Sequence, residues 1–139
     1  MPDLFARFAR KDRDVIVIGD VARLSSGCFK KRRGESALSI ICIDACDKQD
    51  KNAIFLLGEK FLKNIYAYGE LHNDFISSLQ YDEENNFCCC TQQTGKHLEH
   101  FEIQPDPRDI SKIKMFETLE ACEKIAKKLS EHSVAFKKE

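Results

Sequence analysis

The sequence predicts an α+β fold in which an antiparallel sheet, built as a sandwich or an open barrel, is closed by a C-terminal amphipathic helix. Two observations predict it. Strand-like runs separated by short turn-forming breaks fill residues 52–104, and an apolar stripe with helical spacing follows near the C-terminus. A helix of that kind buries its stripe against the sheet, and 139 residues that are 42% hydrophobic suffice for one core.

The chain reads as one domain over residues 14–136, preceded by an N-terminal extension over residues 1–13. Apolar and basic side chains mix over residues 4–11, a pattern typical of a docked or frayed end, or of a basic turn that touches a membrane or an acidic partner. Apart from the proline near the start, the only prolines are Pro105 and Pro107, so the interior shows no second-domain boundary.

Two elements open the domain. The β-branched run Val15–Ile18 predicts a strand over residues 14–24, with Gly19 as a bulge or a point of close approach. After a basic loop, residues 36–47 fit a strand or a helix. We favour a short helix, because Ser36 suits an N-cap and the apolar spacing is partly helical.

The middle of the chain predicts an antiparallel meander. Its apolar runs are short, and the breaks between them are rich in Gly, Asn, Asp and Glu. A loop is expected after the last run, because prolines cannot donate to a sheet ladder. The expected strands cover residues 52–58, 61–68, 74–81, 86–93 and 97–104.

Residues 118–132 carry the strongest helical pattern. Thr118 can accept a hydrogen bond as the N-cap, and Glu120 stands four residues before Lys124 in the favourable order for an ion pair. The apolar stripe consists of Leu119, Cys122, Ile125, Ala126 and Leu129.

Composition excludes several classes of protein. Lys and Arg number 22 against 23 Asp and Glu, so the net charge of −1 argues against a surface devoted to nucleic acid. No apolar run approaches the ~20 residues of a transmembrane helix, and the first residues lack the pattern of a secretory signal. We expect a cytoplasmic protein with reduced cysteines, with membrane association or a nuclear location as alternatives.

The cysteines suggest packing rather than chemistry. Cys88, Cys89 and Cys90 are consecutive on an expected strand, so their side chains alternate between its faces and cannot converge on a metal. A catalytic cysteine would need a base, and nothing in the sequence places a thiol beside any of the four histidines. We therefore expect no metal, no cofactor and no enzymatic activity; the histidines are His72, His97, His100 and His132.

Three segments resemble the pleckstrin-homology superfold and, within it, the phosphotyrosine-binding (PTB) family. VIVIGDVARL with its following basic loop is similar to the family's first strand, and HNDFISSLQYDEENNFCCC to its central strand pair. HFEIQ and ACEKIAKKLSEHSVAFKKE are similar to its last strand and closing helix, nearest to the small integrin-tail-binding adaptors. The absence of Trp disfavours pleckstrin-homology domains proper and the Enabled/WASP type.

The resemblance implies a non-enzymatic adaptor that captures a short peptide, similar to Asn-Pro-x-Tyr, from a receptor tail or cytoplasmic partner. The peptide would add as a strand beside residues 75–81, in a groove against the closing helix. An ordinary edge strand and plain core packing are the alternatives for these residues. The implied peptide-binding residues are Phe75, Ile76, Ser77, Ser78, Leu79, Gln80, Tyr81, Ile125, Leu129, His132 and Phe136.

A run of basic residues suggests an alternative function, the binding of an anionic membrane surface. Lys30, Lys31, Arg32 and Arg33 are consecutive in the loop after the first strand. In a pleckstrin-homology-like domain they would bind phosphoinositide headgroups at a membrane surface; a nuclear localisation signal and a solvated loop are the alternatives. A free sheet edge would also allow a homodimer.

Overall fold

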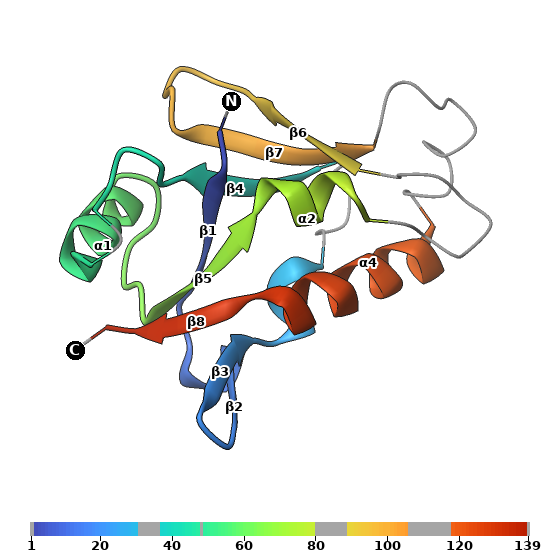
Figure 1. Cartoon of the computed structure of the whole chain (residues 1–139), viewed down its shortest axis with the longest axis horizontal. Coiled ribbons are helices and arrows are strands. Elements are labelled where there is room, and N and C mark those ends of the chain that lie inside the picture. Colours follow the sequence, from blue (N-terminus) through green and yellow to red (C-terminus); the bar gives the residue numbers. More distant parts are fainter. Residues whose placement is uncertain (1, 31–36, 48, 80–88, 106–117, 139) are drawn as a thin grey trace.

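Figure 1 shows the computed structural model of the chain, which describes residues 2–30, 37–47, 49–79, 89–105 and 118–138. One antiparallel sheet carries the fold, with strands in the spatial order β6-β7-β4-β1-β5-β8; a separate hairpin, β2–β3, stands beside it. The elements are β1 (Leu4–Ala9), η1 (Asp12–Asp14), β2 (Val15–Ile18), β3 (Val21–Leu24), η2 (Ser26–Phe29), β4 (Leu38–Cys42), α1 (Lys51–Glu59), β5 (Ala67–His72), α2 (Asn73–Ser77), β6 (Cys89–Gln93), β7 (His100–Pro105), α4 (Leu119–His132) and β8 (Val134–Lys137).

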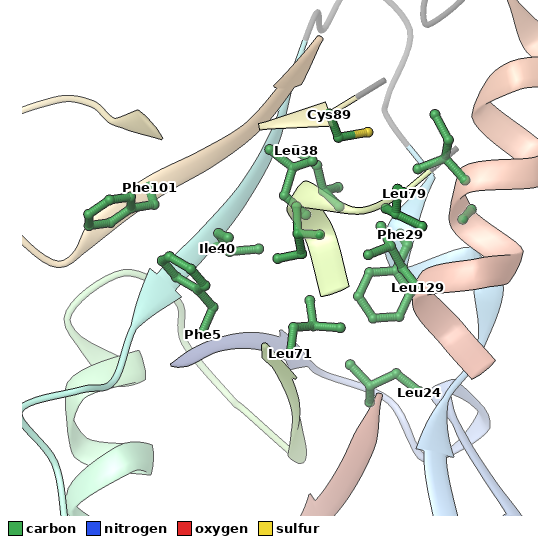
Figure 2. Packing of buried hydrophobic residues seen from close by; sticks show 14 of the residues in the cluster. Phe5, Leu24, Phe29, Leu38, Ile40, Leu71, Leu79, Cys89, Phe101 and Leu129 are labelled. Atoms are coloured by element: carbon green, nitrogen blue, oxygen red, sulfur yellow. The ribbon is translucent and has the colours of Figure 1, made fainter. Parts of the chain in front are cut away.

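The expected α+β class with an antiparallel sheet is confirmed, and the sheet is not closed into a barrel. Helices cover both of its faces. In one apolar cluster, α2 and α4 pack against the sheet. Figure 2 shows this cluster, in which Leu129 of α4 also lies beside Phe29 of η2 and near Leu24 of β3. In a second cluster α1 packs against the opposite face through Ile54 and Phe55.

The N-terminal segment is the largest correction to the sequence-based expectation. Instead of an extension before residue 14, Leu4–Ala9 forms β1, which lies between β4 and β5 (Figure 1). Its side chains alternate between the two clusters: Phe5 packs on Phe101 at 5.1 Å between ring centroids, while Phe8 packs on Tyr68 at 6.2 Å. A strand that buries apolar residues on both faces is part of the core.

Three other elements differ from expectation. Residues 14–24 form the hairpin β2–β3 rather than one strand, because Gly19 adopts φ +62° at the turn. The favoured helix at residues 36–47 is instead β4, in which Ile40 and Ile41 are buried on opposite faces. The expected strand over residues 52–58 is α1, begun by the Asp50 side chain, which accepts from the Ala53 amide.

The strand expected to receive a peptide is also absent. Asn73–Ser77 forms helix α2, and Ile76 and Leu79 are buried in the core, while Gln80 and Tyr81 lie outside the described residues. The strand expected over residues 61–68 begins only at Ala67, as β5. The last two expected strands are confirmed over their described parts, as β6 and β7.

The closing helix is confirmed as α4, with the Thr118 side chain accepting from the Ala121 amide. Ile125, Ala126 and Leu129 are buried as expected, whereas Leu119 at the first position is exposed. The chain then forms β8 beside β5, an element that the sequence analysis missed. Because β8 places Phe136 against Tyr68 in the second cluster, Phe136 is separated from the α4 residues with which it was grouped.

Candidate functional site: a basic groove between β1 and β4

The candidate site lies where β4 parts from β1. The two strands pair only at Phe5 with Cys42 and at Ala6 with Ile41, although β1 continues to pair with β5 as far as Ala9. In Figure 1, β4 lies at a wide angle to β1, and the two strands are hydrogen-bonded neighbours only where they pair. The second half of β1 therefore has a neighbouring strand on one side only, within the described part of the chain.

The register shows which main-chain groups face this opening. The Leu4 carbonyl accepts from the Ile43 amide on the β4 side, and the Ala9 carbonyl accepts from the Tyr66 amide on the opposite side. The main-chain groups of successive residues in a strand point alternately to its two sides. The N–H and C=O of Phe8 therefore point toward β4, as those of Leu4 do. In an extended chain those of Arg10 point the same way. Lys11 is still extended, at φ −129° and ψ 145°. The edge thus offers alternating donors and acceptors.

Arg7 bridges β1 and its neighbours at the end of the groove where β1 and β4 still pair. Its Nε donates to the Cys28 carbonyl at 2.9 Å, and its Nη1 donates to the Ser39 carbonyl at 2.6 Å. Ser39 is the residue that would face Phe8 if the ladder continued in the same register. The guanidinium therefore joins β1, β4 and η2 at the point where β4 leaves β1.

The resulting groove has a volume of about 940 Å³, in the upper part of the range for ligand sites. Phe8 and Phe61 supply apolar surface, and the Phe61 ring lies 6.0 Å from the ring of His100. Among the described residues that line the groove, one carboxylate, that of Asp14, stands against five cationic side chains. These are Arg7, Arg10, Lys11, Arg13 and Lys30.

One cysteine lines the groove. The Cys28 thiol donates to the Asp14 carbonyl, with 3.7 Å between sulfur and oxygen, and lies 3.7 Å from Ser25 Oγ. Burial raises the pKa of this thiol. It is therefore protonated near neutral pH and is a weak nucleophile. The chemistry that the groove offers is recognition by charge and by main-chain hydrogen bonds.

The structure separates the residues that the sequence analysis grouped as a site. Ile125 and Leu129 are buried in the core with Ile76 and Leu79, so they do not line a groove there. Ser77 is half-buried in α2, and the exposed Ser78, its C-terminal cap, donates to the Phe75 carbonyl. Of the basic run, Lys30 lines the new groove, while Lys31, Arg32 and Arg33 lie outside the described residues.

The expected alternation of the cysteine run is visible where the structure describes it. Cys89 is buried in the core and Cys90 is half-buried on the next position of β6, while Cys88 lies outside the described residues. Within the described ranges, no group of three His, Cys, Asp or Glu side chains could hold a metal ion.

His132 does not line a peptide groove but stacks flat on Phe75, with 3.8 Å between ring centroids. Burial, and then the neighbouring His72, lower its pKa from the usual 6.5, and its buried Nε2 has no hydrogen-bond partner. The folded protein therefore prefers the neutral ring, and its stabilisation is complete above pH 6.5 and is lost as the pH falls through the lowered pKa.

We therefore expect the free energy of unfolding to fall between about pH 7.5 and pH 5.5, and to fall less in His132→Phe, which keeps a ring on Phe75 without a titrating group. Urea denaturation at a series of pH values measures this. An unchanged pH dependence in the variant would show that other groups are responsible.

The sequence suggested Arg7, Arg10 and Lys11 as binding residues only through the alternative of a basic turn that touches a membrane or an acidic partner, because residues 1–13 were expected to form an extension. Arg13 was not among the expected site residues. A signal was present: residues 4–9 are all apolar except Arg7. A short apolar run of this length is typical of a strand that is buried on both faces.

The structure contains no helix, among the residues that it describes, that is long and apolar enough to cross a membrane. In comparisons with known proteins, no family model, no curated protein and no solved structure matches the chain. A functional assignment therefore depends on the geometry of the groove.

Proposed function

We propose that the chain is a non-enzymatic binding module that captures a short extended peptide from a partner protein by adding it as a strand along β1. The observation that carries this proposal is the edge of β1 at Phe8, which has no neighbouring strand on the β4 side among the described residues and lies in a groove of about 940 Å³. Strand addition of this kind gains affinity from main-chain hydrogen bonds and specificity from pockets for alternate side chains.

Strand addition is the mode of binding that the resemblance to the PTB family implies. The proposed binding strand, β1, differs from the segment that the resemblance implies. Residues 75–81 cannot accept a strand, since Asn73–Ser77 is helical. A PTB-like fold remains part of the proposal. An antiparallel sheet with an amphipathic C-terminal helix packed against it supports that likeness.

The edge of β1 favours a peptide over a phospholipid headgroup. Phe8 directs both a donor and an acceptor into the groove. An extended polypeptide presents an amide donor and a carbonyl acceptor at the spacing of a strand, so it matches both groups, whereas the ionised phosphate oxygens of a headgroup match only the amide. Headgroup binding by Lys30 and its neighbours is therefore an outcome to be tested and not the proposal.

Selection of peptides tests the function directly. The immobilised full-length protein is incubated with a pool of heptapeptides randomised at every position, and the peptides that it retains are sequenced and resynthesised. Each is then N-methylated in two versions, one at its odd residues and one at its even residues. Because a strand directs alternate amides to opposite sides, we expect one version to lose binding at least about tenfold and the other to keep it.

Two results would reject strand addition. One is that the pool yields no retained peptide. The other is that both N-methylated versions bind as tightly as the parent peptide, which would show that main-chain amides do not contribute.

A further inference from the structure

We propose that the peptide captured in the groove is acidic, with Asp or Glu side chains that face Arg10, Lys11, Arg13 and Lys30. This inference names the ligand class of the proposed peptide site and rests on that function. Capture of a neutral peptide would agree with strand addition but not with an acidic ligand. The proposed function and this inference can therefore fail separately.

The four cations are available to a ligand. Arg10, Lys11, Arg13 and Lys30 are all exposed. The salt bridges of the described residues lie elsewhere, between Lys124 and Glu120 and between Lys138 and Glu59, and none joins these four cations to a carboxylate. Asp12, the other carboxylate of this segment, accepts a hydrogen bond from the Tyr66 hydroxyl at 2.7 Å.

The cations that line the groove come from different elements of the fold. Arg10 and Lys11 continue β1, Arg13 belongs to η1, and Lys30 directly follows η2. A strand laid along Phe8 would lie in the groove that these cations line. Since its side chains alternate between two faces, acidic residues on either face meet a cation.

Electrostatics makes this arrangement selective. Among the described residues that line the groove, five cationic side chains stand against the single carboxylate of Asp14, an excess of four positive charges. Opposite charges that face each other across neighbouring strands attract and stabilise the pairing of the strands. Like charges at the same distance destabilise, so a basic peptide is repelled while an acidic one is attracted and reaches the groove faster.

Arg7 differs from the four exposed cations in its role. The Arg7 guanidinium donates to two main-chain carbonyls, so it fixes the positions of the segments that border the groove. It also adds positive potential at the end of the groove where β1 and β4 still pair. A ligand carboxylate placed there would face a charge that is already fixed in position, and fixed charges lose no side-chain entropy on binding.

The peptide selection described above also tests this inference. We expect the retained peptides to be enriched in Asp and Glu over the starting pool, and their affinity to fall as salt is raised, because the cations are exposed. In the double variant R10E/R13E the same peptides should bind at least about tenfold more weakly. The matched control K96E/K127E makes the same change in net charge outside the groove lining and should bind as the unmodified protein does.

The outcomes separate the claims. The inference of an acidic ligand would be overturned if the retained peptides were not enriched in Asp and Glu and R10E/R13E bound them as tightly as the unmodified protein. Strand addition would remain supported by that result. The absence of any retained peptide would reject the proposed function itself. The last comparison uses phosphatidylserine vesicles. The inference would be overturned if the protein bound them at a lower lipid concentration than the concentration needed of any peptide, and if R10E/R13E removed that binding, because the cations would then serve a membrane surface.

Discussion

Replacement of Arg7 by Met lowers the free energy of unfolding by about 3 kcal/mol and removes binding of the selected peptides. The expected stability loss follows from two hydrogen bonds of a charged donor, each contributing about 1.5–3 kcal/mol with part of that recovered by hydration of the carbonyls. Loss of the guanidinium frees Ser39 and Cys28 from β1, so the walls of the groove are no longer held in place. Urea denaturation and peptide titration measure the two effects.

Arg10→Met is the matched control for this prediction. It removes the same side chain from an exposed position, so it should change stability by less than about 0.5 kcal/mol. Arg7→Lys should be intermediate, because an ammonium group cannot reproduce the fork that reaches two carbonyls. Equal stability of Arg7→Met and Arg10→Met would contradict the holding role of Arg7.

Replacement of Gly58 by Val destabilises the protein by about 3 kcal/mol, at the upper end of the roughly 1–3 kcal/mol that overpacking costs. A Cβ at Gly58 would stand 2.5 Å from Phe8 Cε1 and 2.8 Å from Ile65 Cδ1. Because α1 lies this close to β1, the variant should also displace Phe8 from the groove and weaken peptide binding.

The control places the same residue on the solvent side of the same helix. Leu56 is 65% exposed, so Leu56→Val should cost no more than about 0.5 kcal/mol. Thermal denaturation of the two variants compares them. Similar melting temperatures would show that Phe8 can move away from a new side chain at Gly58 without cost.

The sequence predicted the elements that carry their own local signals. The helix α4 has a capping residue, an apolar stripe and an ion pair at helical spacing, and all of these lie within 15 residues. The strands β6 and β7 are joined by a short turn and pair with each other. Such features depend on neighbouring residues only, so the sequence is sufficient to recognise them.

Other elements depend on contacts between distant residues. The run at Asn52–Gly58 is apolar for long enough to be either a strand or a helix, and periodicity alone cannot separate them. The cap at Asp50 and the packing of Ile54 and Phe55 against the sheet decide for a helix. Conversely, β4 became a central strand because both of its faces are buried, which removes the alternation that marks a strand at a surface.

The site was predicted only in part. Lys30 was expected to bind an anionic group, and it does line the basic groove. The rest of the groove exists because β1 pairs with β4 at only two positions, and that divergence brings residues 7–13 beside Lys30. No local pattern in either segment encodes where two strands part, so the sequence alone could not place the edge at Phe8.

Amide hydrogen exchange of Phe8, measured by NMR with and without a selected peptide, tests the central claim most directly. If the peptide adds as a strand along β1, the Phe8 amide gains a hydrogen-bond partner and its exchange slows, while the Ala9 carbonyl keeps its bond to Tyr66 and the Tyr66 amide is unaffected. Unchanged exchange at Phe8 under saturating peptide, with protection at another edge such as β8 or β6, would contradict the groove between β1 and β4 as the binding site.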